Sequence, residues 1–251
     1  MRIAIYSQYI SSQGGMQTYT FELANALAKK NEVFIISTKK GKVDPISFPL
    51  DSKVRVVELK ESKIRFLGIL LDSYSLRKAL KKINPHVLHF QTTLNIKMLI
   101  ESLYLKICPF IFTIHDPRIN PGRDNLLKKI LNKLITIIGD TFIVHGEKLK
   151  KDLIFDMSIP EQSVHVIPHG NLNLFKDKEL NILEEKETIL FFGHIEKYKG
   201  IKYLFEAYKI LFKMYPNIKI IIAGRGDEIE KYRNIYDSNP NFEIHNKFIK
   251  N

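Results

Sequence analysis

Short apolar runs alternate along this 251-residue chain with longer segments whose apolar residues recur at helical spacing. The first run, Arg2–Ser7, is followed by a segment from about Met16 to Lys30 that has Phe21, Leu23, Ala24 and Leu27 on an apolar face. Short apolar runs fit buried strands, and a helical period fits an amphipathic helix. The repeated pair therefore predicts an α/β protein with an open parallel sheet. The predicted strands are Arg2–Ser7, Val33–Thr38, Val54–Leu59, Val87–Phe90, Phe110–Ile114, Thr141–Val144, Val164–Ile167, Ile189–Phe192, Ile218–Ala223 and Phe242–His245. Further helices are predicted over Ile64–Ile83, Asn95–Ile107, Asp124–Ile137, Glu147–Phe155 and about Glu228–Tyr236.

The alternating pattern lapses once, after His169. Residues 171–187 are polar and rich in Asn, Lys and Glu, which is typical of a linker. We therefore expect one domain over residues 1–170, a linker over 171–187 and a second domain over 188–251. The second series has three predicted strands, fewer than the five or six of a typical sheet. It predicts a partial domain.

Composition limits the partners. The formal charge of +12 favours an anionic partner, such as nucleic acid, a phosphorylated small molecule or an acidic membrane surface. A lysine-rich surface without any such partner explains the charge equally well. No sequence signature of nucleic-acid binding is present, so we expect no nucleic-acid partner. Cys108 is the single cysteine, which excludes a disulfide within the chain.

The N-terminal segment reads as a strand rather than a signal peptide, because it lacks a long apolar core and a small-residue cleavage site. No apolar run is long enough to span a bilayer. We expect a cytoplasmic protein, with peripheral contact at the inner face of the plasma membrane as a further hypothesis. That hypothesis rests on the basic segments around Lys60–Lys82 and Lys128–Lys133.

The segment ILFFGHIEKYKG, residues 189–200, is the strongest candidate for a ligand loop. Ile189–Phe192 is predicted to be a strand buried on both faces, and it ends at Gly193. Lys199 and Gly200 then open an amphipathic helix predicted over Ile201–Tyr215. Backbone N–H groups, a helix N-terminus and an ammonium group can together bind a phosphate. Most junctions of this kind bind nothing, so both interpretations stay open.

Two other glycine turns fall at equivalent places. Gly14 and Gly15 precede the first predicted helix, where small residues let an anion or a sugar approach the backbone, although a plain flexible turn fits too. Gly224 and Arg225 follow the predicted strand Ile218–Ala223.

Three predicted strands end in histidine: His115, His145 and His169. Ligands collect at the carboxyl ends of parallel strands, so these side chains are candidate binding groups. Metal binding is disfavoured, because the histidines lie on separate strands with no close pair and no clustered carboxylates. Hydrogen bonding to a sugar or phosphate, with one histidine near the reaction chemistry, is the better functional hypothesis. Histidines that merely satisfy backbone groups remain an alternative, above all for His145.

The motifs described above, taken in their order along the chain, resemble those of the retaining glycosyltransferases of family 4. The resemblance covers nearly the whole chain, and it rests on the ordered set rather than on any one motif. It implies a GT-B-like α/β fold, with a complete N-terminal Rossmann-like domain and a partial second one. It also implies a nucleotide-diphosphate sugar as co-substrate, a glycan or lipid-linked acceptor, retention of configuration and no obligatory metal. The matching stretches are GGMQTYTFELANALAKKNEVFIIST, VLHFQ, TIHD, IVHGEKLKKDL, VHVIPHGN, FFGHIEKYKGIKYLFEA and IIIAGRGD.

The resemblance also suggests individual roles. His115 matches the histidine that contacts the donor sugar near the reacting carbon, and it is the catalytic candidate. Gly15 would approach the diphosphate or the sugar, and Lys199 matches the lysine that binds the diphosphate. Gly224 and Arg225 fall in the second nucleotide loop. His145 and His169 are candidates for acceptor or sugar contacts, and Gly14, Gly193 and Gly200 for donor contacts.

Two departures from the family pattern bear on activity. The family places an arginine at the position of Glu196 or of His194, and neither is arginine here. The family's two-glutamate motif would lie beyond Asn251, so we expect a C-terminally truncated enzyme whose donor site is incomplete. The competing hypothesis is a non-catalytic binding or scaffold chain that pairs with a separate polypeptide supplying the rest.

Overall fold

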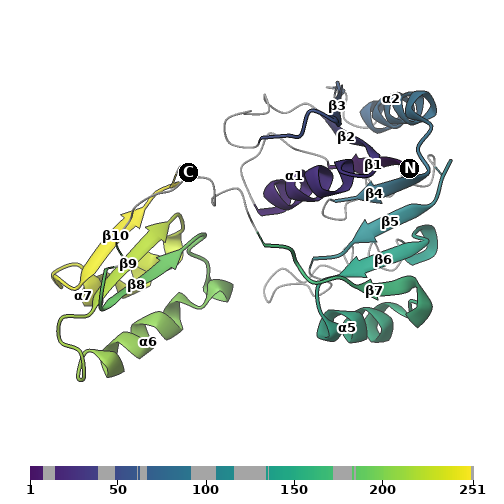
Figure 1. Ribbon diagram of the computed structural model, residues 1–251. Helices are drawn as coiled ribbons and strands as arrows, with labels where there is room; N and C mark the ends of the chain where they lie inside the picture. The colour runs from purple at the N-terminus through teal and green to yellow at the C-terminus, as the bar shows by residue number, and fades with distance from the viewer. Residues whose placement is uncertain are drawn as a thin grey trace. The chain divides into compact units, whose positions relative to one another are not determined.

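The computed structural model describes residues 1–7, 15–38, 49–60, 62, 67–91, 106–115, 134, 136–171, 183 and 185–249. The chain divides into two compact units, Met1–Lys178 and Glu179–Asn251, each with its own parallel sheet (Figure 1). The predicted boundaries at residues 170 and 188 remain predictions, because most of the segment between them lies outside the described residues.

Unit 1 contains a seven-stranded parallel sheet in the order β3-β2-β1-β4-β5-β6-β7. The order reverses between β1 and β4, which lie on either side of the switch point where open α/β sheets bind ligands. All seven strands predicted from the apolar runs are present, with ends that differ by at most one residue. Their bounds are β1 Arg2–Tyr6, β2 Glu32–Thr38, β3 Val54–Leu59, β4 Val87–Phe90, β5 Phe110–Thr113, β6 Thr141–Val144 and β7 Val164–Val166.

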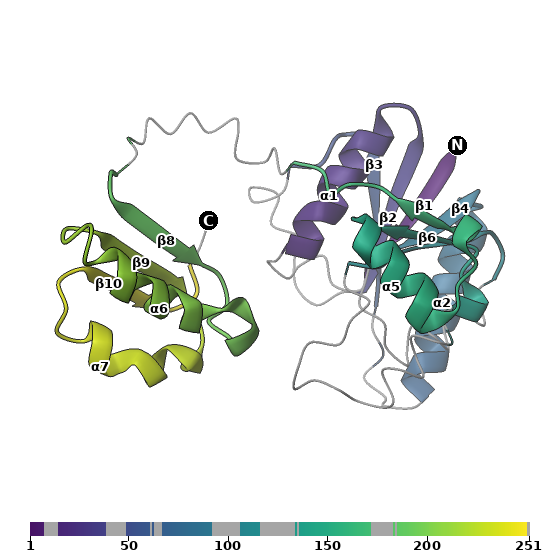
Figure 2. The same cartoon turned by 90° about the horizontal axis from the view of Figure 1, so that it is seen from below.

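Helices cover both faces of this sheet (Figure 2). Helix α1 (Gly15–Ala28) packs Phe21 and Ala24 against one face. Helices α2 (Leu67–Ile83) and α5 (Glu147–Met157) pack against the other, and η1 (Glu161–Ser163) precedes β7. Two-sided burial explains why inner strands such as β1 and β5 are continuous apolar runs rather than alternating ones.

Two predicted helices of unit 1 fall largely outside the described residues. The one predicted over Asn95–Ile107 does not reach Lys106 or Ile107, which are not helical. The one predicted over Asp124–Ile137 is described only near its end, where residues 136–138 are helical.

Unit 2 has a three-stranded parallel sheet in the order β10-β9-β8. One face packs against α6 and the short helices η4 and α7 (Figure 1). The helix predicted over Ile201–Tyr215 ends at Leu211, and the one predicted near Glu228–Tyr236 consists of η4 followed by α7. The bounds are β8 Thr188–Phe192, η3 Lys197–Lys199, α6 Ile201–Leu211, β9 Lys219–Gly224, η4 Asp227–Tyr232, α7 Arg233–Tyr236 and β10 Phe242–Asn246.

The prediction that Ile189–Phe192 is buried on both faces is wrong. Ile189 and Phe191 pack into the unit 2 core, whereas Leu190 and Phe192 are 61% and 63% exposed. Successive side chains in a strand point to opposite faces, and no helix among the described residues covers the second face. We call this second face, which carries Leu190, Phe192 and Ile221, the open face.

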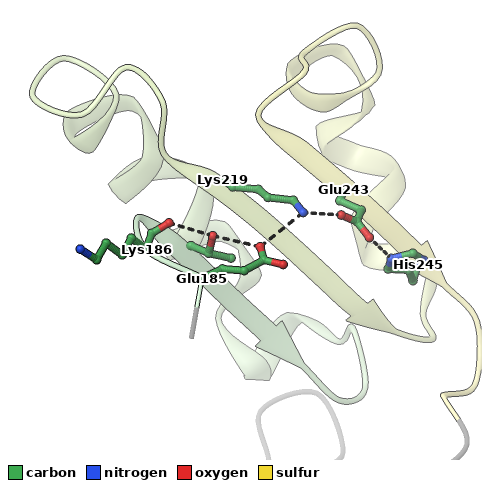
Figure 3. A network of polar contacts seen from close by, with 6 residues as sticks. Glu185, Lys186, Lys219, Glu243 and His245 are labelled. Atoms are coloured by element: carbon green, nitrogen blue, oxygen red, sulfur yellow. Dashed lines mark hydrogen bonds and ion pairs between the residues drawn. The ribbon is translucent and has the colours of Figure 1, made fainter. Parts of the chain in front are cut away.

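A polar network lies on the same face (Figure 3). The Lys219 ammonium lies 2.8 Å from a carboxylate oxygen of Glu243 and 3.6 Å from one of Glu185. The other oxygen of Glu243 lies 2.6 Å from Nε2 of His245. The hydrogen bond from Lys219 lowers the pKa of Glu243, and the same bond raises the pKa of Lys219. These side chains are partly exposed, so the network joins β9, β10 and the approach to β8 without a large effect on stability.

Candidate functional site

The three histidines that follow β5, β6 and β7 lie together around Tyr19 of α1. The Tyr19 ring centroid lies 5.1 Å from that of His115, 5.3 Å from His145 and 4.8 Å from His169. The imidazoles also contact one another, with centroids 4.9 Å apart for His115 and His145 and 5.1 Å for His145 and His169. We call these four residues the histidine cluster. It lies entirely within unit 1.

A buried polar network lies beside the cluster at the ends of β4 and β5. The side-chain amide of Gln91 donates to Oγ1 of Thr113 at 2.9 Å, and Nε2 of His89 lies 2.7 Å from the same oxygen. Oε1 of Gln91 lies 3.4 Å from Nε2 of His115. Burial raises the pKa of Tyr19, and its hydrogen bond with Thr113 opposes that rise. The network therefore connects His115 to the switch point of the sheet, where Gln91 follows β4.

Two histidines of this region are neutral at physiological pH. Burial lowers the pKa of His115 to about 4, and repulsion from His145 and His169 adds to the effect. Burial lowers the pKa of His89 to about 4 as well, with a contribution from His115. A neutral imidazole has one donor and one acceptor nitrogen, so His115 can hydrogen-bond a ligand without carrying charge.

Gly15 is the first residue of α1, and Gly14 lies outside the described residues. A Cβ built on Gly15 would meet none of the described residues within 4 Å. The surroundings therefore give no steric reason for glycine at this position.

In unit 2, the loop after β8 and the turn after β9 are joined by backbone hydrogen bonds. The N–H of Gly193 donates to the carbonyl of Ala223, and the N–H of Ile195 donates to the carbonyl of Arg225, both at 3.0 Å. The parallel ladder thus continues past the strand ends into both predicted nucleotide loops.

Glycine is required in these loops for two reasons. A Cβ on Gly224 would lie 1.7 Å from the carbonyl oxygen of Gly193, and one on Gly226 would lie 2.1 Å from that of Ile195. Gly193 and Gly200 adopt positive φ angles of 122° and 79°, which other residues rarely adopt. The four glycines therefore set the path of the backbone.

A cavity of about 570 Å³ opens between these loops. Its charged lining has two cations and three carboxylates, so it is not a simple anion pocket. Arg225 lies in the lining, whereas the predicted lysine, Lys199, does not. The Lys199 ammonium lies 5.1 Å from the centroid of the Tyr198 ring. The lining residues are His194, Ile195, Glu196, Lys197, Arg225, Gly226, Asp227 and Glu228.

Residues 13–170 match the family described as Glycosyltransferase Family 4, and residues 174–245 match the one described as Glycosyl transferases group 1. The chain belongs to glycosyltransferase family 4. This family 4 chain is 26% identical over 247 residues to an uncharacterized glycosyltransferase of Haemophilus influenzae, covering 93% of this chain and 65% of the relative. It is 25% identical over 238 residues to an N-acetylgalactosaminyltransferase of Campylobacter jejuni whose named acceptor is linked to undecaprenol diphosphate, covering 90% and 62%. The family 4 chain therefore spans less than two thirds of either relative.

Solved structures agree on the fold. Sucrose-phosphate synthase from Thermosynechococcus elongatus matches with a TM-score of 0.67 at 16% identity, covering 98% of this chain and 70% of its own. HepE from Anabaena, in complex with UDP and glucose, matches with a TM-score of 0.66 at 12% identity, covering 96% and 68%. The prediction of a GT-B-like α/β fold is confirmed.

Sequence reasoning missed four residues of this region: Tyr19, His89, Gln91 and Thr113. His89 and Gln91 did carry a signal, because both are polar and lie two residues apart at the end of the apolar run VLHF. Such a pair points to one face of a strand. Tyr19 carried none, since an aromatic residue on an apolar helix face is ordinary.

The described residues contain neither a candidate metal centre nor a membrane-spanning helix. No group of three His, Cys, Asp or Glu side chains there is arranged to hold a metal ion. In the same residues, no helix has the length and apolar character needed to cross a membrane.

Proposed function

We propose that this family 4 chain takes part in moving a sugar from a nucleotide-diphosphate sugar to a glycan or lipid-linked acceptor, with retention of configuration. The observation that carries the proposal is the histidine cluster at the carboxyl ends of three strands, in the half that matches Glycosyltransferase Family 4. The name of the Campylobacter jejuni relative supports a lipid-linked acceptor.

In this proposal His115 contacts the donor sugar as a neutral imidazole, and His145 and His169 contact sugar hydroxyls. The departing diphosphate gains negative charge as the glycosidic bond breaks, so cations and N–H donors beside it lower the barrier. Arg225 and Lys199 are the proposed cations. Gly14, Gly15, Gly193, Gly200 and Gly224 are the proposed positions at which the absence of a side chain lets the diphosphate approach the backbone. No residue of the proposed mechanism requires a metal.

Calorimetric titration of the purified chain with UDP, GDP and their sugars tests donor binding. We expect heat with one nucleotide series, and release of the nucleotide when a suitable acceptor is added. Substituting His115→Ala should then lower transfer by about a hundredfold, as expected for loss of a group that acts in the transition state. His165→Ala is the matched control, because His165 is an exposed histidine on β7. Absence of heat with every nucleotide in a folded sample would refute donor binding.

A second candidate function is a non-catalytic chain that pairs with a separate polypeptide. The open face favours it, because Leu190 and Phe192 are more than half exposed on a parallel sheet, and such sheets are normally covered on both faces. The downstream DNA can be read for a coding segment with the two-glutamate motif, and its product coexpressed. Copurification that is lost in a Leu190→Ser, Phe192→Ser variant would support pairing. A wild-type chain that transfers sugar unaided would refute it.

Cytoplasmic location with peripheral contact at the inner face of the plasma membrane is a further part of the proposal. The described basic residues that support it are Lys78, Lys81 and Lys82 of α2. Sedimentation with phosphatidylglycerol vesicles, but not with phosphatidylcholine vesicles, is the expected result. Equal sedimentation with both would refute an electrostatic contact.

A further inference from the structure

A second cavity, of about 570 Å³, opens at the edge of the unit 1 sheet where the strands begin. The histidine cluster follows the carboxyl ends of the strands, so the two lie at opposite edges of the same sheet. We call this cavity the basic pocket, because cations dominate its lining. Its charged and imidazole side chains are those of Arg2, Lys29, Lys30, Glu32, Lys53 and His86.

Four of these residues form a row across neighbouring strands. Arg2 and Glu32 are the first residues of β1 and β2 and lie opposite each other. Lys53 and His86 come directly before β3 and β4, the outer neighbours of those two strands. The order across the sheet is therefore Lys53, Glu32, Arg2, His86. Neighbouring strands lie about 4.8 Å apart, so the row is roughly 14 Å long.

Hydrogen bonds order both ends of this row. The N–H of Lys53 donates to a carboxylate oxygen of Asp51, and the N–H of His86 donates to the carbonyl of Arg2, both at 2.9 Å. The N–H of Arg2 donates in turn to Nδ1 of His86 at 2.8 Å. That bond holds the imidazole in place, and Nε2 has no hydrogen-bond partner among the described residues. A ligand would therefore meet a backbone that is already ordered, which reduces the entropy lost on binding.

The charges of the basic pocket are not balanced. Four cations and one carboxylate give a net formal charge of +3, and within the described part of the chain none of the five forms an ion pair. Strand beginnings elsewhere differ. Lys106, before β5, lies 3.2 Å from Asp140, which directly precedes β6. Lys219, the first residue of β9, lies 2.8 Å from Glu243. Cations at those edges are neutralised by the protein itself, whereas those of the basic pocket are left to repel one another.

The dipole of α1 accounts for only part of this charge. The C-terminus of a helix is partly negative, so the two lysines directly after α1 are favourable there without any ligand. The carbonyl of Leu27 already accepts from the N–H of Lys30 at 3.2 Å and from the amide of Asn31 at 3.0 Å. The dipole acts over the last turn of the helix, so it does not explain Arg2 or Lys53 on the neighbouring strands.

We infer that the basic pocket binds an anion that carries more than one phosphate group. Arg and Lys side chains are the usual ligands of phosphate, and the row is too long for a single phosphate to contact both of its ends. Strand β1 has five residues and is roughly 17 Å long, so this ligand is separate from any sugar or diphosphate bound at the histidine cluster. A soluble polyphosphate and neighbouring headgroups of an anionic membrane present the same chemistry. The inference does not depend on the proposed function.

NMR of the histidine-labelled full chain, titrated with sodium tripolyphosphate at constant ionic strength, tests the site through His86. We expect a saturable shift of the His86 imidazole signals and none at His165, an exposed histidine on β7. Lys29→Gln combined with Lys53→Gln should raise the dissociation constant at least about tenfold, because charge-assisted hydrogen bonds are lost. Both lysines are exposed, so the double variant should fold like the wild type.

The matched control is Lys202→Gln combined with Lys209→Gln, which removes two exposed cations of α6 and leaves the same net charge. This control should bind tripolyphosphate like the wild type. Absence of a saturable His86 shift, or an equal loss of affinity in the two double variants, would overturn the inference.

Two further arms separate this site from the proposed donor site and identify the source of the phosphate. Lys199→Ala should leave the His86 titration unchanged, and a His86 shift that disappears in this variant would overturn the basic pocket. Phosphatidylglycerol vesicles should displace tripolyphosphate, and should sediment the wild type but not the Lys29→Gln, Lys53→Gln variant, if the source is a membrane. A His86 titration that is unchanged by these vesicles assigns the pocket to a soluble polyphosphate.

Discussion

Gly224→Ala should destabilise unit 2 far more than its size suggests. The added Cβ would lie 1.7 Å from the carbonyl oxygen of Gly193 and 2.8 Å from its carbonyl carbon. Both atoms are backbone, so no side-chain rotation can relieve the contact. Ordinary contact begins at 3.4 Å, so the loop and the strand end would have to move about 1.7 Å apart.

The size of the effect follows from what that movement breaks. The bonds from Gly193 to Ala223 and from Ile195 to Arg225 flank the contact, and each contributes about 1 kcal/mol. Overpacking adds roughly 1–3 kcal/mol. Replacing glycine gains only about 0.4–1 kcal/mol from the unfolded chain. We therefore expect a loss of about 2–5 kcal/mol, a sizeable part of a domain's stability.

Urea unfolding followed by circular dichroism measures this loss, since the two units allow separate transitions. Gly170→Ala is the control, because a Cβ there meets no described residue within 4 Å. The control should unfold like the wild type. A Gly224→Ala protein whose unit 2 transition is within about 0.5 kcal/mol of the wild type, the range of an ordinary surface substitution, would refute the close backbone contact.

Three further predictions follow from the same structure. The pKa of His89 is about 4 in the folded state and near 6.5 in the unfolded state, so between these values the unfolded state binds one more proton than the folded state. The free energy of unfolding should therefore be full above about pH 6.5 and fall by up to about 3 kcal/mol as the pH drops to 4. In His89→Gln, the pH dependence of the free energy measured by urea unfolding should be weaker by about one proton. Lys199→Ala and Arg225→Ala should each weaken nucleotide-diphosphate binding about tenfold, or about 1.4 kcal/mol, when binding is measured by calorimetry. Lys202→Ala, which removes an exposed cation of α6, is the control and should not weaken binding. Equal affinities in all three variants would remove both side chains from the proposed site. Glu243→Gln should lower the salt dependence of unit 2 unfolding with little change in its midpoint, because Glu243 binds Lys219 and His245 at the surface; a midpoint shift as large as that of Gly224→Ala would contradict this.

The fold was predictable because the spacing of apolar residues along the sequence reflects which side chains are buried. Every strand of both sheets coincides with a predicted strand, and the lapse after His169 begins three residues after the last strand of unit 1 ends at Val166. The limit of the method is visible at Ile189–Phe192. Four consecutive apolar residues look the same whether a second layer covers the strand or not, so the sequence could not reveal the exposure of Leu190 and Phe192.

The candidate site was predictable only in part. The rule that ligands gather at strand ends selected His115, His145 and His169 as candidates, and the structure brings their rings into contact. It could not select Tyr19, because the contact of the Tyr19 ring with the imidazoles depends on how α1 packs against the sheet. That packing is a property of the folded core. The position of Lys199 outside the loop cavity likewise depends on the direction of a surface side chain, which local sequence does not encode.

The backbone hydrogen bonds between the two loops of unit 2 join both loops to the sheet as one rigid element. Amides of surface loops normally exchange with solvent quickly, yet the N–H groups of Gly193 and Ile195 are bonded as strand amides are. Their exchange should follow the opening of the whole sheet rather than local motion. Substitutions that change this cavity and leave the sheet intact are therefore confined to side chains that line it, because a change in the backbone would disturb the sheet itself. These side chains are His194, Glu196, Lys197, Arg225, Asp227 and Glu228.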